Sequence, residues 1–138
     1  MAHVVTKMLV GEIYDRETRQ TSVLRWCAET FGNGIEVTPG VRLMRFIEEA
    51  TEMAQAFGLS EADVQKVVSY VYARPVGELS QEVGGVAITL MAFVESVGLS
   101  LPGCELTEIQ RINAKDPERF KQRAREKGEA NLIPTPKD

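Results

Sequence analysis

The sequence predicts an all-α protein, a helical bundle of about five helices. Apolar residues recur at helical spacing, capping and stop residues separate the apolar segments, and no useful stretch alternates between polar and apolar residues as a half-buried strand would. With 138 residues, 43% of them hydrophobic, the chain is long enough to bury a core. We expect one domain over residues 1–138, with an N-terminal extension at 1–16 and an irregular tail at 129–138.

Glycine and proline mark the first two predicted helices. One helix covers residues 17–31 and stops at the Gly-Asn-Gly sequence at 32–34. The next has Thr38 as its N-cap, Pro39 at its first helical position and Gly58 after its last turn. These are strong boundary signals, so we expect both helices close to these limits.

The next two helices differ in character. Ser60 caps a short third helix, with Asp63 three residues on as in a capping box, and this helix ends before Pro75. A fourth helix at 77–97, with Gly98 as its stop residue, is nearly apolar all round over residues 86–94. Such a helix is buried on more than one side, which indicates either the centre of a bundle or a subunit interface.

The last third of the chain is predicted to be helical after a loop. The sequence SLPGCE at 100–105 is expected to be that loop, followed by a segment at 106–115. Asp116 and Pro117 then start a basic last helix that ends near Gly128.

Charge and cysteine content exclude several classes of protein. The net charge of -4 disfavours a general nucleic-acid binder, and no apolar stretch approaches the roughly 18 residues that span a bilayer. Cys27 lies in a helical pattern and Cys104 in a Pro-Gly turn, so we expect two reduced thiols. Since the only histidine is His3, Cys-His catalysis is not expected. The N-terminus has no secretory signal pattern, and the expected location is cytoplasmic.

An acidic face on the second helix is the first candidate site. Glu48, Glu49 and Glu52 gather beside its apolar side, together with Arg45. Like charges at four-residue spacing repel, and a hard divalent cation between them would turn that repulsion into binding. The alternative is a solvated face on which Arg45 pairs with Glu49.

The fourth helix supplies more acids. Glu78, Glu82 and Gly85 fall on one stripe next to its apolar side, where a carboxylate is costly unless it is paired or bound to metal. Two antiparallel helices would bring both acidic sets to one metal cluster. The alternative is that Glu82 pairs with Arg42 or Arg45.

The two acidic sequences resemble a known family. RFIEEATEMAQAFG at 45–58 and ELSQEVGGVAITLMAF at 78–93, preceded by VLRWCAETFG at 23–32, are similar to the all-α nucleoside triphosphate pyrophosphatases, the MazG-like superfamily. The resemblance covers roughly residues 18–127. It implies a MazG-like fold that assembles as a dimer or tetramer. It also implies Mg²⁺, with Mn²⁺ as the alternative ion, and hydrolysis of a nucleoside triphosphate to a monophosphate and pyrophosphate.

The resemblance assigns roles to the acids. Glu48, Glu49 and Glu52 match the family's E-E-x-x-E block and Glu82 the first acid of its E-x-x-D block, so these four are the implied metal ligands. Glu49 and Glu52 are the candidate catalytic residues that orient the attacking water. Gly85 stands where the family has Asp, which removes one ligand and puts catalysis in doubt. One turn before Glu82, Glu78 is the candidate substitute.

Basic side chains are needed for the phosphates, because no Gly-rich phosphate loop is present. The candidates are Arg42, Arg45, Arg111, Lys115 and Arg119, with Lys121 and Arg123 as further members of the C-terminal set. For that C-terminal set the alternative is a solvated basic helix end.

Two functions remain open from the sequence. One is a Mg²⁺-dependent nucleotide pyrophosphohydrolase acting on a nucleoside triphosphate or related nucleotide. The other is a catalytically degenerate MazG-like oligomer with a nucleotide-binding, regulatory or interaction role.

Overall fold

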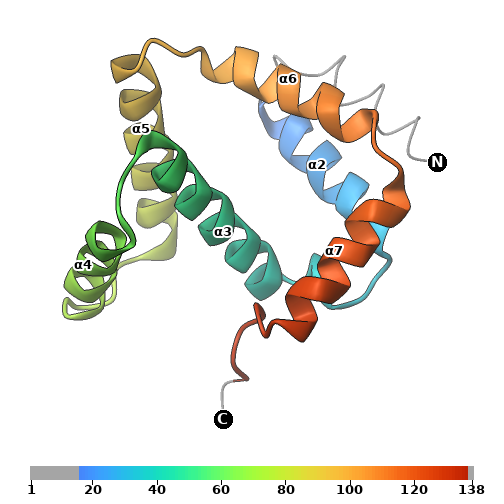
Figure 1. Ribbon diagram of the computed structural model, residues 1–138, viewed down its shortest axis with the longest axis horizontal. Helices are drawn as coiled ribbons and strands as arrows, with labels where there is room; N and C mark the ends of the chain where they lie inside the picture. The colour runs from blue at the N-terminus through green and yellow to red at the C-terminus, as the bar shows by residue number, and fades with distance from the viewer. Residues whose placement is uncertain (1–15, 137–138) are drawn as a thin grey trace. The chain divides into compact units, whose positions relative to one another are not determined.

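A computed structural model describes residues 16–136 of the chain (Figure 1). The described part is entirely helical, so the all-α prediction is confirmed for it. Its elements are α2 (Arg16–Phe31), the 3₁₀ helix η1 (Ile35–Val37), α3 (Pro39–Phe57), α4 (Glu61–Tyr72), α5 (Leu79–Ser96), α6 (Leu101–Asn113) and α7 (Pro117–Glu129). No single helix of this part is long and apolar enough to cross a membrane, although α5 and α6 taken together would pass on length and composition.

One predicted loop is wrong. The sequence at 100–105 is helical from Leu101, so α6 begins five residues before the predicted segment and Cys104 lies in a helix. Pro102 and Gly103 are tolerated there because the N–H groups of a helix's first turn have no intrahelical partner. The predicted N-terminal extension, and His3 with it, falls outside the described residues except at Arg16. Past Glu129, the tail is irregular through residue 136, as predicted.

Two predicted stop residues adopt the left-handed backbone that favours glycine. Gly58 has a φ of 110° and Gly98 a φ of 70°. In both cases the next residue closes the helix end, since Leu59 N donates to Ala54 O at 3.0 Å and Leu99 N to Val94 O at 3.1 Å. Each glycine therefore ends its helix and turns the chain.

The predicted capping box of α4 is formed. Ser60 Oγ accepts from Asp63 N at 3.2 Å, and the Asp63 carboxylate accepts from Ser60 N at 3.2 Å. These bonds lower the pKa of Asp63, with the Ser60 hydroxyl as the main cause. The reciprocal bonds satisfy two backbone donors at the start of a 12-residue helix.

Replacement of the cap should weaken α4. We expect Ser60→Ala to lower the free energy of unfolding by about 1 kcal/mol, because an N-terminal backbone donor loses its acceptor. Urea unfolding followed by circular dichroism measures this difference. Ser69→Ala in the interior of the same helix is the control and should cost nothing, since alanine has the higher helix propensity. Equal losses for both variants would contradict the role of the cap.

The chain divides into two compact units, Met1–Met44 with Leu101–Asp138, and Arg45–Ser100. The boundary falls within α3, so the acidic block belongs to the second unit. That both units form the single domain expected from the sequence stays a prediction.

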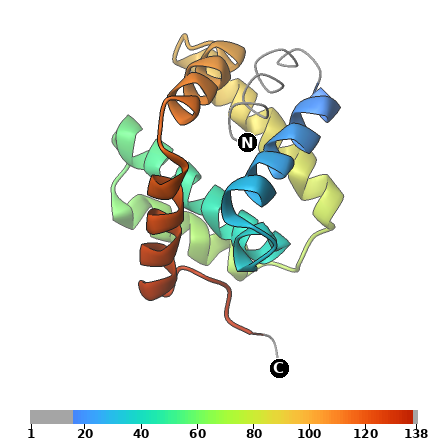
Figure 2. The ribbon, with the colours of Figure 1, turned by 90° about the vertical axis from the view of Figure 1, so that its right-hand side faces the viewer.

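In the first unit, α2 contacts α7, and the two helices can be followed in Figure 2. The ring of Trp26 meets that of Phe31 at 6.0 Å and that of Phe120 at 5.2 Å, both edge to face. The buried residues of α2 are all small, and they are Ser22, Cys27 and Thr30. Burial raises the pKa of the Cys27 thiol, against the lowering effect of the Arg42 guanidinium.

The second unit contains the C-terminal part of α3, then α4 and α5 (Figure 1). Phe57 at the end of α3 meets Phe93 near the end of α5, with ring centroids 5.4 Å apart. The contact joins the two C-terminal ends, so the predicted antiparallel pairing is wrong. The reason is α4, which reverses the chain once between them, so that the first and third helices of the unit run the same way.

Much of the apolar surface in the second unit is exposed. Of residues 45–100, only Val94 is buried. The predicted apolar side of α5 is open over its first half, with Leu79 74% and Val83 61% exposed, and on α3 Ile47 is 50% exposed. These helices therefore do not make a closed core by themselves.

Candidate functional site

The acids of α3 differ in burial. Glu48 is half-buried, and its Oε2 lies 3.8 Å from Nη1 of Arg45, whose side chain is only 12% exposed. Glu49 and Glu52 are exposed. The pairing of Arg45 with Glu49, expected if the face were simply solvated, is thus replaced by a pair with Glu48. A cation at this face would have two accessible carboxylates and would compete with Arg45 for the third.

Glu78 has a structural role. It is the N-cap of α5, and its Oε2 accepts from Gln81 N at 3.1 Å and from the Ser80 hydroxyl. These bonds hold the pKa of Glu78 below its ordinary value of 4.5, with the Ser80 hydroxyl as the main cause. A metal could use this carboxylate only by sharing it with the cap.

The Glu78 cap makes the stability of α5 depend on pH in the acid range. Because the folded pKa of Glu78 is depressed, its contribution is present above pH 4.5 and is lost as the pH falls through the lower folded value. We expect Glu78→Ala to lower the melting temperature near neutral pH and to match the parent in strong acid. Melting curves across this range provide the measurement. Ser80→Ala should move the acid midpoint upward, toward the ordinary value, and a pH-independent difference would contradict the assignment.

Glu82 folds back toward the start of its helix. A Cβ on Gly77 would lie 3.0 Å from Glu82 Cδ, so the carboxylate occupies space that any other residue at position 77 would fill. A carboxylate is favoured there by the positive end of the helix dipole. The expected alternative was an ion pair between Glu82 and Arg42 or Arg45. Instead, Arg42 pairs with Glu36 and Arg45 pairs with Glu48.

The acids of the two helices belong to one unit but lie far from the point where the helices meet. At 1.5 Å per residue, Glu48 is about 14 Å along α3 from Phe57 and Glu82 about 17 Å along α5 from Phe93, and the two helices share no extended contact. Within residues 16–136, no three Asp, Glu, His or Cys side chains are close enough together to hold an ion. The donor chemistry suits a hard divalent cation, but binding one would require the acidic parts of α3 and α5 to approach each other.

Gly85 faces open space. A Cβ at this position meets nothing within 4 Å, and the same holds for its neighbour Gly84. The backbone at residue 85 therefore has room for a carboxylate.

Three of the five basic candidates are engaged in ion pairs. Arg42 donates to Glu36 Oε2 at 2.9 Å and to Cys27 Sγ at 3.4 Å. Arg111 donates through two nitrogens to the carboxylate of Glu108 and lowers the pKa of that acid. Arg45 is the third, through its pair with Glu48 on α3.

The other two basic candidates meet in a pocket of about 420 Å³ in the first unit. It is lined by Lys115, Arg119, Phe120, Gln122, Arg123 and Glu126. The volume lies within the range of small-ligand sites. Three cations oppose one carboxylate, so the pocket favours anions.

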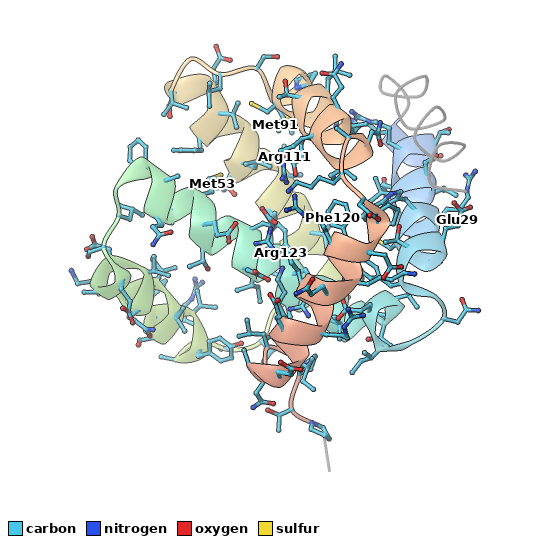
Figure 3. The ribbon with its side chains drawn as sticks, turned by 45° about the vertical axis from the view of Figure 1, so that its right-hand side comes forward. Glu29, Met53, Met91, Arg111, Phe120 and Arg123 are labelled. Atoms are coloured by element: carbon cyan, nitrogen blue, oxygen red, sulfur yellow. The ribbon has the colours of Figure 1, made fainter. Side chains whose placement is uncertain are left out.

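The sequence interpretation missed the aromatic wall of this pocket. Phe120 and Arg123, three residues apart, lie on the same side of α7 (Figure 3). Lys115 Nζ lies 5.9 Å from the centre of the Phe120 ring, which Trp26 contacts from α2. The four-residue spacing of Arg119 and Arg123 indicates that both arginines lie on one face of the helix. No comparable signal in the sequence indicates that Phe120 lines a pocket with them.

Comparison with known proteins finds no family model that matches the chain and no curated protein or solved structure significantly similar to it.

Proposed function

We propose that the protein is a MazG-like, Mg²⁺-dependent nucleotide pyrophosphohydrolase of the cytoplasm, which cleaves a nucleoside triphosphate or related nucleotide to a monophosphate and pyrophosphate. The observation that supports the proposal is that Glu48, Glu49 and Glu52 on α3 belong to the same compact unit as Glu82 on α5. Two of the α3 carboxylates are accessible to solvent, as a metal ligand must be before binding.

The acids and the ion divide the chemistry. In the proposal Glu48, Glu49, Glu52 and Glu82 hold Mg²⁺, or Mn²⁺ in its place, and Glu78 adds its second oxygen. The ion supplies charge neutralisation of the phosphates and a more acidic bound water. Either Glu49 or Glu52 accepts a hydrogen bond from the attacking water and orients it. Glu48 must leave Arg45 to bind the ion, which frees that guanidinium for a phosphate oxygen.

Lys115 and Arg119 are the preferred candidates for phosphate ligands, because their side chains line one anion-favouring pocket of the first unit. Arg42 and Arg111 would have to exchange their carboxylate partners for phosphate, so we assign them secondary roles.

Pyrophosphate release from a panel of nucleoside and deoxynucleoside triphosphates with Mg²⁺ tests the proposal. We expect turnover by the parent and loss of at least about a hundredfold in Glu49→Gln and Glu82→Gln, because each substitution removes an anionic ligand. Glu61→Gln, an exposed acid at the start of α4, is the control and should keep full activity. The absence of turnover with every nucleotide, or parental rates in both variants, would overturn the proposal.

We also propose that a second copy of the chain covers the exposed apolar surface of α3 and α5, giving a dimer or a tetramer. A monomer rarely leaves so many large apolar side chains in water, and a helix that is apolar all round needs cover on several sides. A second copy of the chain is the partner that the family resemblance implies for this surface.

Light scattering after gel filtration tests the assembly. The parent should have a multiple of the 15.3 kDa chain mass, and Val83→Glu should shift it toward a monomer because a buried charge is costly at an apolar interface. Val23→Glu, at a half-exposed position in the first unit, should not change the mass. A parent that is monomeric at every concentration would contradict the assembly.

The second candidate function is a non-catalytic relative that binds nucleotide or a partner. Gly85 and the separation of the acids favour it, because a site with a ligand missing binds Mg²⁺ weakly. The two functions predict different effects of Mg²⁺ and nucleotide on the melting temperature. A working site should raise the melting temperature when Mg²⁺ and a nucleotide are present together, whereas the degenerate relative should show no effect of Mg²⁺.

A further inference from the structure

We propose that the pocket on α7 is a nucleoside triphosphate site in which Arg119 and Arg123 bind the phosphates and the ring of Phe120 packs against the base. The inference rests on the proposed function for the choice of nucleotide, but it concerns binding in the first unit and needs no metal.

The charges of the pocket fit a polyphosphate. Arg119 and Arg123 are four residues apart on α7 and therefore project from one face of the helix, with Lys115 in the turn before it. The only opposing charge in the lining is Glu126, whose Oε1 accepts from Gln122 Nε2 at 3.2 Å. Two guanidinium groups on one face can each donate two hydrogen bonds to phosphate oxygens.

The volume and the aromatic wall indicate a ligand larger than phosphate. The pocket of about 420 Å³ is open to solvent and is lined by residues 115–126 alone, and it is larger than a lone anion fills. Phe120 contributes an apolar ring directly beside the cations, and stacking or edge contacts with such rings stabilise bases. A nucleotide combines both chemistries in one molecule. A nucleic-acid strand is disfavoured by the net charge of -4.

Trp26 makes the site rigid and observable. Its ring meets that of Phe120 at 5.2 Å and 89°, and it meets Phe31 on α2 as well, so packing against α2 restrains the Phe120 ring. It is also the only tryptophan in the chain. A ligand against Phe120 should therefore change the tryptophan emission directly.

Binding without metal tests the inference. The parent is titrated in EDTA with each of the four common ribonucleoside triphosphates, with tripolyphosphate and with adenosine, by calorimetry and by Trp26 emission. We expect at least one triphosphate to bind about tenfold or more tightly than tripolyphosphate and than adenosine, since only the nucleotide meets both the arginines and the ring. The Trp26 emission should change with the same affinity.

Two variants locate the site. Arg123→Gln should weaken triphosphate binding about tenfold, since one charge-assisted contact is lost, and Arg125→Gln, an exposed arginine of the same helix outside the pocket, should leave it unchanged. The inference is overturned if no triphosphate binds at millimolar concentration, if tripolyphosphate binds equally well, or if Arg123→Gln behaves as the parent. Glu49→Gln and Glu82→Gln should bind normally in EDTA, so failure of hydrolysis and failure of this site give different results.

Discussion

Gly85→Asp is expected to strengthen Mg²⁺ binding by about tenfold or more and to raise the rate of pyrophosphate release. The new carboxylate lies three residues after Glu82 and therefore on the same side of α5. Added carboxylate charge tightens the binding of hard cations, and each tenfold in affinity corresponds to about 1.4 kcal/mol. A Cβ at residue 85 meets no atom within 4 Å, so the side chain fits without repacking.

The adjacent glycine is a matched control. Gly84 is equally open, but one helical residue rotates its side chain by about 100°, away from Glu82. Gly84→Asp changes net charge and helix propensity in the same way as Gly85→Asp. Calorimetric Mg²⁺ titrations of both variants separate a ligand effect from a general charge effect, and equal affinities would show that the stripe on α5 does not face the ion.

Trp26→Ala should cost about 3 kcal/mol of unfolding free energy, at the lower end of the range for large aromatic truncations because the side chain is only half-buried. The ring joins α2 to α7 through Phe120, and its loss removes both edge-to-face contacts. Urea unfolding at fixed protein concentration, followed by circular dichroism, gives the difference.

Leu24→Ala is the control on the same helix. Leu24 is 52% exposed, so its truncation should cost less than about 1 kcal/mol. If both substitutions cost the same, the Trp26 ring would not be the contact that holds α7 on α2.

Local signals in the sequence were sufficient for the helix boundaries. Thr38-Pro39, Gly58, Ser60 and Gly98 act on the backbone within one turn, and each helix begins or ends where they predict. The exception is α6, because a Pro-Gly pair marks either a loop or a helix's first turn and only the surrounding packing decides between them.

Long-range arrangement was harder to predict. The predicted antiparallel pairing of α3 and α5 was wrong. Because α4 lies between them and reverses the chain direction, α3 and α5 run the same way and meet at their C-terminal ends. The packing of α2 shows a related difficulty. Ser22 and Thr30 are buried, whereas Leu24 is half-exposed. Close packing favours side chains of the right size as well as apolar ones, so hydrophobicity alone does not identify the buried residues.

The candidate site was predicted as a set of residue types. The E-E-x-x-E spacing identifies the acids, but the pair of Arg45 with Glu48 and the capping role of Glu78 depend on side-chain rotamers that periodicity does not specify. The contact of Phe120 in the α7 pocket with Trp26 joins residues far apart in the sequence, and no local pattern indicates it.

A crystal structure of the protein with Mn²⁺ and a non-hydrolysable nucleoside triphosphate analogue tests the central claim most directly, because anomalous scattering locates the ion without reference to the protein. We expect the ion to lie about 2.0–2.3 Å from carboxylate oxygens of Glu49, Glu52 and Glu82, with Glu48 released from Arg45. An ion held by other residues, or no ion at saturating Mn²⁺, would contradict the account.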